Sequence, residues 1–454
     1  MGLVTLSCYP NHVEDHCCGT AQPGPQGLGA RGPRGSPFRQ RGCYVETGVK
    51  ERSPDELLEL DLVWTDYTKD PQVPRPVEVK SGDWGLGDVF KFFGWTRYIG
   101  LEPGQFVHKE PCGRLDPDSL THVARRTGIA FLPVRRPEEA DTQFKTLGLP
   151  DPTREELPEI WRYSFWCQRR LLKSLNEAIK KGLCPETLRA AKQYYQLVND
   201  AVFFVQDVRD RVGLLLSAHL DHPALAASAA HELETGRIDF TNPPQTETFK
   251  RAYYHGEHFP IQACLYLAHR ARLYILKAVV DYWLARERGD IKKLVVKLGD
   301  ALIDLTAGKL SAAMAAGINE LAAARSLRRF PVFWQTFLWS WGGFVLKDRL
   351  DQEYDDLSKE TAVPVAEIPL ALSAFDKLFP TPGGWFREPD GDSRKLLVLM
   401  PPTLRGLGAF RRRVRANVDQ YSDLGYEDST SLRLMWDNNT CVRHLECADA
   451  DLTT

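Results

Sequence analysis

Two carboxylates and one lysine lie within apolar segments near the beginning of the chain. Asp61 interrupts one such segment, and Glu78-Val79-Lys80 ends the next one. Side chains alternate between the two faces of a strand, so Glu78 and Lys80 would share one face and the flanking valines the other. Charged groups on a buried face of a sheet are unfavourable unless they are paired. A divalent cation and a phosphate group would pair them, so the pattern indicates phosphodiester chemistry.

Hydrolysis of a phosphodiester needs a cation that neutralises charge on the phosphate and lowers the pKa of the attacking water. Magnesium prefers hard oxygen ligands and keeps several waters, so a few protein ligands suffice. The carboxylates of Asp61 and Glu78 and the backbone carbonyl of Val79 would hold Mg²⁺ or Mn²⁺. Lys80 would orient the water and stabilise the transition state. Asp66 is the alternative to Asp61, although a solvated loop is the more ordinary place for it.

The segments around these residues predict a compact α/β domain at residues 42–137. Apolar runs with alternation predict strands, prolines and glycines separate them, and helical spacing predicts two helices. The expected strands are residues 43–49, 57–67, 75–80, 105–109 and 129–134, and the expected helices are residues 88–98 and 117–127. This order, β-β-β-α-β-α-β, is typical of a small mixed sheet with flanking helices.

Asp61, the sixteen residues after it and Glu78-Val79-Lys80 resemble the active site of the PD-(D/E)xK nucleases, the restriction-endonuclease-like superfamily. The order of the expected elements is similar to that superfamily as well. The resemblance covers residues 42–135 only. It implies a Mg²⁺-dependent nuclease with DNA as the expected substrate, in prokaryotic defence or DNA processing. It also implies that Asp61, Glu78 and Lys80 are the catalytic residues.

The superfamily normally has a helix before the first strand, often with an extra acidic residue. Here residues 21–42 contain six glycines, four prolines, four arginines and no acid. Such a tract has little to bury, so we expect residues 1–41 to be disordered and the helix to be absent. In the absence of that helix, Glu46 or Glu59 would supply the extra acidic group. A misplaced start of the chain is the alternative interpretation of this tract.

Three further residues are candidates for auxiliary roles near this site. Lys91 and Tyr98 lie on the expected helix after the lysine, and they resemble polar residues that some branches of the superfamily place there. An ordinary helix surface is the alternative for both. Trp84 lies in a loop with glycines, where it would stack on a nucleic-acid base or anchor the loop.

The sequence pattern changes after the α/β domain, at residue 138 and again at residue 161. Residues 138–160 are polar and contain prolines, which predicts a linker. Residues 161–346 have long stretches of helical periodicity, which predicts an all-α domain and a surface for a protein partner. Histidines and acids gather at residues 219–231 and 255–258 without an established zinc spacing, so we expect them to be solvated or structural.

Residues 347–454 are expected to form a mixed α+β region. The pattern predicts a helix at residues 369–378 and a hairpin between residues 385–387 and 395–400, and a winged helix is one interpretation of that pair. A basic run follows, which is either a solvated helix face or a phosphate-contacting one. Its members are Arg411, Arg412, Arg413 and Arg415.

Composition bounds these interpretations. Hydrophobic residues make up 43% of the chain and charged residues 26%, which is ordinary for a soluble globular protein. The net charge of −2 means that contact with nucleic acid would depend on a local basic surface. Irregularly spaced cysteines and the lack of a secretory pattern predict a cytoplasmic protein, and the most apolar stretch is too short for a membrane span. The alternative function is a catalytically inactive nuclease-like domain on a helical scaffold that binds nucleic acid or protein.

Overall fold

The structure is a computed structural model of the 454-residue chain. Most of the first part of the chain and much of the helical part are described, in the ranges that follow. These are residues 36–52, 56–80, 82–109, 116–135, 137–153, 202–221, 259–292, 297–341, 344–346, 350–379 and 396–398, with positions 176, 177 and 180. Every structural statement below concerns these residues.

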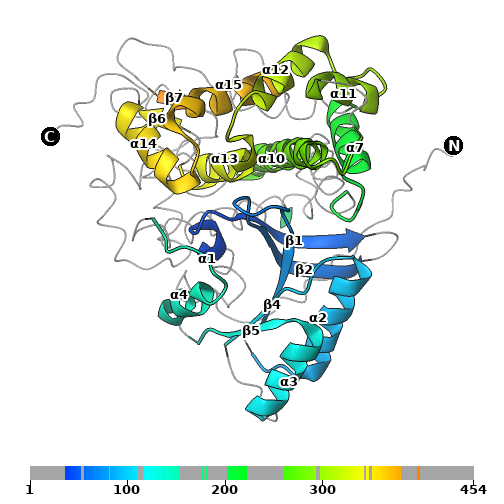
Figure 1. The fold of residues 1–454 in the computed structure, drawn as a ribbon, viewed down its shortest axis with the longest axis vertical. Helices are drawn as coiled ribbons and strands as arrows, with labels where there is room; N and C mark the ends of the chain where they lie inside the picture. Colours follow the sequence, from blue (N-terminus) through cyan, green and yellow to red (C-terminus); the bar gives the residue numbers. More distant parts are fainter. Residues whose placement is uncertain are drawn as a thin grey trace.

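A five-stranded mixed sheet forms the first part of the molecule (Figure 1). Its strands lie side by side in chain order, antiparallel from β1 to β3 and parallel from β3 to β5. They are β1 (Tyr44–Arg52), β2 (Glu56–Thr65), β3 (Arg75–Lys80), β4 (Gln105–His108) and β5 (Ala130–Pro133). Helix α2 (Leu86–Tyr98) joins β3 to β4, and α3 (Pro117–Thr127) joins β4 to β5. The element order that the sequence predicts for this part is therefore confirmed.

Helices cover both faces of the sheet (Figure 1). Val77 and Val79 of β3 belong to the apolar cluster on one face. On the other face, Phe106 of β4 packs with Val89 and Phe92 of α2. The predicted alternation along β3 is present. The two valines pack in the first cluster, while Lys80 pairs with Asp88 of α2 on the other face.

Ordered structure begins inside the segment that we expected to be disordered. Helix α1 (Ser36–Arg39) is a single turn before β1, and it contains no acidic residue. Phe38 is fully buried, stacked on Trp64 with ring centroids 5.0 Å apart and edge-on to Phe144 at 4.7 Å. The expectation for residues 1–41 is wrong for residues 36–41, because one aromatic side chain supplies enough buried surface to fix this turn.

The expected linker at residues 138–160 is also wrong in its first part. Helix α4 (Pro137–Lys145) packs on the same face of the sheet as α1. Ala140 and Phe144, four residues apart on one side of this helix, are buried, and so is Leu149 after it. The sequence pattern did not indicate this helix, because its few apolar residues lie within a polar segment that contains prolines. Residues 154–160 lie outside the described part.

The second part of the molecule is mostly helical, as the sequence predicts. Its helices share one large apolar core. They are α7 (Val208–Asp221), α10 (Phe259–Arg288), α11 (Leu298–Leu305), α12 (Ala312–Ala322), α13 (Phe330–Trp339), α14 (Leu350–Thr361) and α15 (Ile368–Leu378), with short 3₁₀ turns at Leu327–Arg329 and Val365–Glu367. Because α14 and α15 pack in this core, the helical part continues well beyond the expected boundary at residue 346.

The strand expected at residues 395–400 is present as β7 (Leu396–Val398). It pairs antiparallel with β6 (Phe344–Leu346), which follows α13. The sequence pattern marked residues 395–400 as a strand but could not identify a partner fifty residues earlier. Residues 385–387 lie outside the described part. Among the described helices, none combines the length and the hydropathy that a membrane crossing requires.

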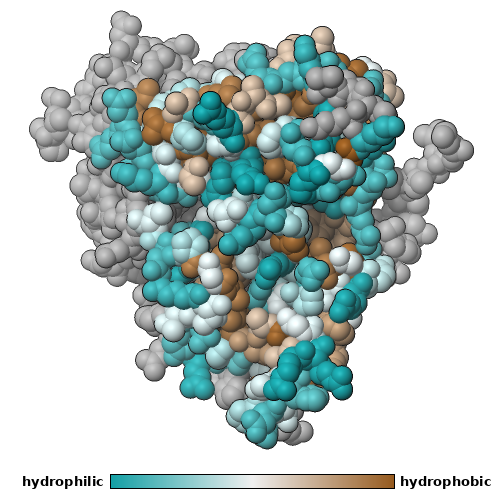
Figure 2. All heavy atoms as spheres, in the orientation of Figure 1, coloured by the Kyte–Doolittle hydropathy of each residue, from teal (hydrophilic) through white to brown (hydrophobic). Residues whose placement is uncertain are grey.

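The helical part closes the outer edge of the sheet. On β1, the Gln335 side chain of α13 accepts a hydrogen bond from the Val45 N–H at 3.0 Å and donates one to the Val45 carbonyl at 2.9 Å. Arg270 of α10 donates to the Thr47 carbonyl at 2.8 Å. An edge strand presents unpaired backbone groups, and these side chains occupy them. Figure 2 shows a mostly hydrophilic face, with small hydrophobic patches scattered over the helical part and the sheet part.

We predict that Gln335→Leu lowers the free energy of unfolding by about 2–4 kcal/mol, because two buried backbone groups of Val45 lose their partners. Gln206→Leu is the matched control. Gln206 makes one exposed hydrogen bond, to the Ile99 carbonyl, and its loss should change stability by less than about 1 kcal/mol. Urea denaturation followed by circular dichroism measures both. Equal effects of the two substitutions would contradict the closing role of Gln335.

Candidate active site

The three residues singled out by the sequence come together where β2 and β3 lie side by side. The pairing of these strands places Leu62 opposite Val77. One step further in the same register, Asp61 falls opposite Glu78, where cross-strand side chains are neighbours. The Asp61 carboxylate turns toward β3 and accepts a hydrogen bond from the Val79 N–H at 3.0 Å. Two carboxylates are therefore adjacent on one face of the sheet.

Lys80 lies between two carboxylates. Its ammonium group is 2.9 Å from Glu78 and 3.0 Å from Asp88. Asp88 is in the first turn of α2, where it also accepts a hydrogen bond from the Gly85 N–H at 3.0 Å. Asp88 is not among the site residues that the sequence pattern predicts. An acid three residues after a glycine at a helix start is a capping signal, and that signal would have placed it beside the loop that follows Lys80.

The electrostatics of the cluster distinguish its members. Burial raises the pKa of Glu78, and the nearby charge of Asp61 raises it further, against the opposing effects of Lys80 and Lys91. Burial lowers the pKa of Lys80, but its bonds to Glu78 and Asp88 outweigh that effect and the pKa is raised. Burial raises the pKa of Asp88, but the Gly85 N–H and Lys80 outweigh it, so this pKa is lowered. At neutral pH Lys80 is cationic.

The donor set suits a divalent cation. Asp61 and Glu78 offer hard carboxylate oxygens, and their proximity disfavours two negative charges without a cation. No group of three or more histidine, cysteine, aspartate or glutamate side chains in the described ranges is arranged to hold a metal ion. A cation here would have only two carboxylate ligands, so the Val79 carbonyl, waters and substrate would complete its coordination.

Of the auxiliary candidates, Lys91 lies near this cluster. Its ammonium group is 4.4 Å from the centre of the Trp95 ring, and its charge lowers the pKa of both Glu78 and Asp88. It can therefore contribute positive charge to the site. A cation placed over an aromatic ring is also a common feature of helix surfaces, which was the alternative interpretation.

Glu59 and Tyr98 have partners outside this cluster. Glu59 of β2 forms an ion pair with Lys50 across the β1–β2 ladder at 3.2 Å. The hydroxyl of Tyr98 donates to Glu51 at 3.4 Å, and its side chain is exposed. Asp66, the alternative to Asp61, accepts two hydrogen bonds from Thr68 in the turn after β2.

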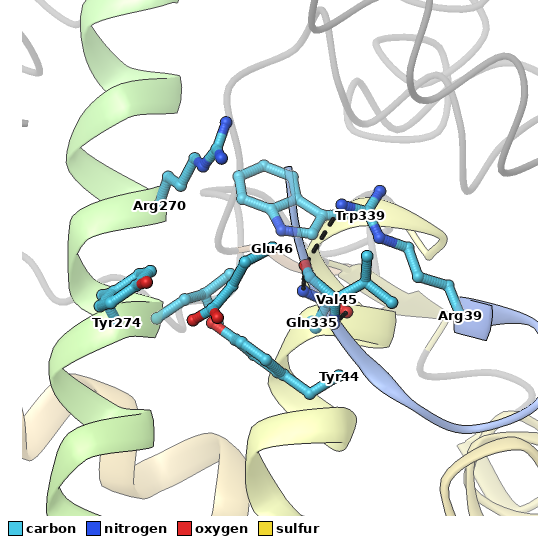
Figure 3. A pocket seen from close by; sticks show the side chains of 9 residues that line it. Arg39, Tyr44, Val45, Glu46, Arg270, Tyr274, Gln335 and Trp339 are labelled. Carbon is cyan, nitrogen blue, oxygen red and sulfur yellow. Dashed lines mark hydrogen bonds between the residues drawn. The ribbon is translucent and has the colours of Figure 1, made fainter. Parts of the chain in front are cut away.

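Glu46 points into a separate buried cavity of about 20 Å³ between β1 and α10, close to Tyr44 and Tyr274 (Figure 3). The cavity has room for about one water molecule. Burial raises the pKa of Glu46, while Lys277 and a bond from Tyr274 oppose the shift. The structure thus directs this acid toward the helical part, and it does not supply an extra ligand beside Glu78.

Trp84 anchors the loop after Lys80. Its side chain is buried, and its ring lies 4.9 Å from that of Phe106 and 4.8 Å from that of His108. Of the two expected roles, anchoring agrees with this packing and base stacking does not. His108 is paired with Lys80 in the β3–β4 ladder, so it lies next to the site. A single histidine at the end of a short strand gave no signal for that position.

The remaining candidates are away from the site or outside the described ranges. The arginines at positions 411, 412, 413 and 415 lie outside, as do the histidines at 222, 231, 255 and 258. His219 is described, and its ring packs edge-on against Phe379 at 5.0 Å. Burial, with the charge of Arg272, lowers the pKa of His219 to about 3, so it is a neutral structural residue.

Comparison of the chain with protein-family profiles, with curated proteins and with solved structures found no match. The resemblance to the PD-(D/E)xK nucleases stays a prediction.

We predict that Glu78→Gln stabilises the protein at pH 7. A folded-state pKa above the unfolded value means that ionisation of Glu78 opposes folding, and this loss grows as the pH rises above the unfolded pKa. The variant should melt about 2–4 °C higher at pH 7, the shift that roughly 1 kcal/mol gives a protein part of this size. The difference in melting temperature between the variant and the wild type should disappear below about pH 4.5, where Glu78 is protonated in both the folded and the unfolded state.

Glu59→Gln is the control for this measurement, because Glu59 is paired with Lys50 at the surface. It should change the melting temperature by less than about 1 °C at either pH. Differential scanning calorimetry across the pH range measures both variants. A lower melting temperature for Glu78→Gln at pH 7 would show that its ion pair with Lys80 outweighs its burial.

Proposed function

We propose that this protein is a metal-dependent nuclease that hydrolyses phosphodiester bonds, with DNA as its substrate. The observation that supports the proposal is the meeting of Asp61, Glu78 and Lys80 at adjacent positions of β2 and β3. Two carboxylates and a cationic side chain at one point are the groups that this reaction requires. We further propose a cytoplasmic protein and a role in prokaryotic defence or DNA processing, by analogy alone.

Each residue of the site has a distinct task in this proposal. Asp61 and Glu78 hold Mg²⁺ or Mn²⁺, which, when bound, neutralises phosphate charge and acidifies the attacking water. Lys80 remains cationic, because Glu78 and Asp88 raise its pKa, so it stabilises charge on the phosphate and orients the water. Asp88 positions Lys80 through the 3.0 Å ion pair and is itself fixed at the start of α2. Lys91 adds positive charge nearby.

A second candidate is a catalytically inactive, nuclease-like binding module. One observation favours it. The ammonium group of Lys80 already pairs with both Glu78 and Asp88, and Asp61 already accepts a backbone hydrogen bond. The charges of this cluster are therefore partly balanced without a metal ion. In that case the helical part would carry the contacts to nucleic acid or protein.

We predict that the purified full-length chain cleaves plasmid or linear DNA when Mg²⁺ or Mn²⁺ is present. Lys80→Ala and Glu78→Gln should each reduce the rate by about 100-fold or more, because each removes a group that acts on the reacting phosphate or water. Lys50→Ala is the control, since it removes a lysine of a surface ion pair and should leave the rate unchanged. Gel electrophoresis with an RNA substrate in parallel identifies the nucleic acid that is cut.

If both site variants still cleave DNA at the wild-type rate, the cleavage comes from a contaminant or from another site of the protein. If no substrate is cut while labelled DNA still binds, the inactive module is the better description.

We predict that Mn²⁺ raises the melting temperature of the wild-type protein and has no effect on Glu78→Gln. A ligand that binds only the folded state stabilises it, by about 2.7 kcal/mol at one hundred times its dissociation constant. Thermal denaturation with increasing Mn²⁺, and with Ca²⁺ for comparison, measures the effect without any assay of activity. A shift of equal size in the wild type and in Glu78→Gln would place the metal elsewhere.

A further inference from the structure

A second and larger cavity, of about 270 Å³, lies where the sheet part meets the helical part. The sheet part contributes the end of β2, the loop after it and the end of α2, and the helical part contributes α7, α10 and the segment before α7. Pockets for small molecules are common at such junctions, and this volume is near the lower end of their usual range of about 300–1,000 Å³. Nothing in the proposed nuclease reaction uses this cavity.

One wall of the cavity is apolar and aromatic. Phe203 and Phe204 lie on it, with ring centroids 5.1 Å apart and ring planes at 77°. Ile99 and Leu101, at the end of α2, face them from the sheet part. Neither phenylalanine side chain is fully buried, so aromatic surface remains available to a flat ligand. Such surfaces bind planar rings by stacking.

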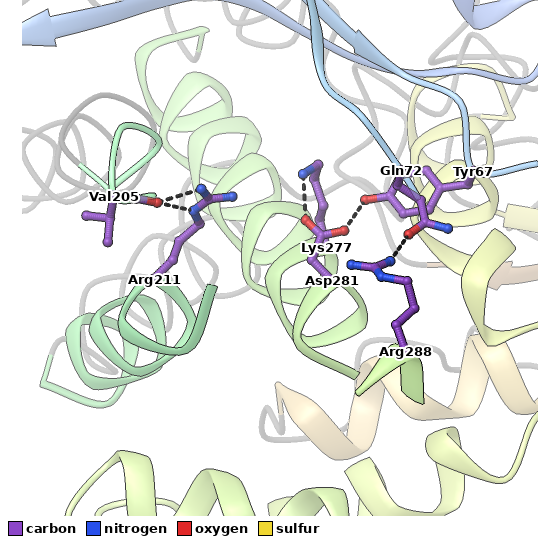
Figure 4. Close-up of polar contacts among 7 residues, drawn as sticks. All are labelled: Tyr67, Gln72, Val205, Arg211, Lys277, Asp281 and Arg288. Carbon is purple, nitrogen blue, oxygen red and sulfur yellow. Dashed lines mark hydrogen bonds and ion pairs between the residues drawn. The ribbon is translucent and has the colours of Figure 1, made fainter. Parts of the chain in front are cut away.

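Arg211 gives the cavity a positive charge that also acts on the buried carboxyl of Glu46, where it lowers the pKa. Its Nε and Nη2 atoms both donate to the Val205 carbonyl, at 2.8 and 2.5 Å (Figure 4). A carbonyl fixes the guanidinium but does not neutralise it, and the structure gives Arg211 no ion pair with any described residue. The planar guanidinium retains the Nη1 donors, which suit a phosphate or carboxylate.

The other charges that line the cavity have partners. Lys277 pairs with Asp281 at 2.8 Å, and the second oxygen of Asp281 accepts a hydrogen bond from Tyr67 at 2.7 Å (Figure 4). Arg288 donates to Asp290 and to Gln72, each at 2.8 Å. Because the single carboxylate on the wall is satisfied at both oxygens, it does not need a cation, and the field in the cavity favours an anion.

One buried polar group points to a ligand with hydrogen-bonding capacity. Thr65, at the end of β2, lines the cavity and is 2% exposed, and within the described ranges its hydroxyl has no hydrogen-bond partner. Buried hydroxyls are normally paired. Thr65 lies four residues beyond Asp61 on the same strand face, about 13 Å away at the rise of a strand. The cavity is therefore separate from the nuclease cluster.

We propose that this cavity binds a nucleoside monophosphate. The base would stack on the ring of Phe204 and meet the ring of Phe203 edge-on, because the two ring planes lie at 77°. The phosphate would pair with Arg211, and the hydroxyl of Thr65 would bond to the base or the sugar. A planar ring, an anionic group and hydrogen-bonding edges in one small molecule match the aromatic wall, the guanidinium of Arg211 and the unpaired hydroxyl of Thr65 together. Both parts of the protein line the cavity, so the ligand ties the sheet to the helical part.

The test is isothermal titration calorimetry of the full chain with AMP, GMP, CMP and UMP. We expect at least one to bind with a dissociation constant of about 0.1 mM or tighter, the strength of one charge-assisted contact with one stacked ring. The same nucleotide should raise the melting temperature. Arg211→Gln should weaken binding by roughly tenfold or more, and Phe204→Ala by roughly fivefold or more.

Matched variants separate binding from folding. Arg211→Lys keeps the charge but loses the paired donation to Val205, so its affinity should fall between those of the wild type and Arg211→Gln. Lys309→Gln removes a surface lysine that pairs with Asp221 at 2.8 Å and should leave the affinity unchanged. The melting temperature of each free variant identifies any that fails to fold, and the conclusion then depends on the remaining variants.

Three results would overturn the proposal. The first is the absence of binding by all four nucleotides at millimolar concentration. The second is affinity that is unchanged in both Arg211→Gln and Phe204→Ala. The third is binding of a 5′-phosphorylated tetranucleotide by a protein that binds none of the mononucleotides. That result would show that the cavity binds the end of a nucleic-acid strand. None of these results depends on whether the protein cleaves DNA.

Discussion

The side chain of Gln335 replaces a missing strand. It gives the outward-facing backbone of Val45 one donor and one acceptor, at 2.9 and 3.0 Å, as a sixth strand would. The edge of the sheet thereby becomes a buried surface. With that edge closed, α10 can lie across β1, and this arrangement creates the buried environment of Glu46 and the larger cavity beside Arg211. The two parts of the chain are in direct contact here.

The sequence predicted well what is local. The strands alternate in hydrophobicity and prolines separate them, so their limits follow from short windows. The neighbouring positions of Asp61 and Glu78 also follow, because consecutive antiparallel strands with a short connection can pair in few registers. Asp88 was missed although its capping position is a local signal. The turn at Phe38 and the helix at Ala140 and Phe144 were missed because a few apolar residues lie within polar, proline-containing sequence.

What the sequence could not show depends on contacts between distant segments. Glu46 was a candidate for the carboxylate cluster, but α10 supplies Lys277 and Tyr274 as its neighbours. β7 pairs with a strand fifty residues earlier. The wall of the larger cavity combines Leu101 with Phe203. No periodicity encodes which faces meet across a hundred or more residues, so tertiary packing decides the environment of each of these groups.

The bond between Val45 and Gln335 joins residues 290 positions apart in the chain. During synthesis at roughly 5–20 residues per second, β1 is made about 15–60 s before Gln335. For that interval β1 is an open template for any other extended polypeptide. A shortened protein that ended before α13 would carry the candidate catalytic cluster on a scaffold prone to aggregate.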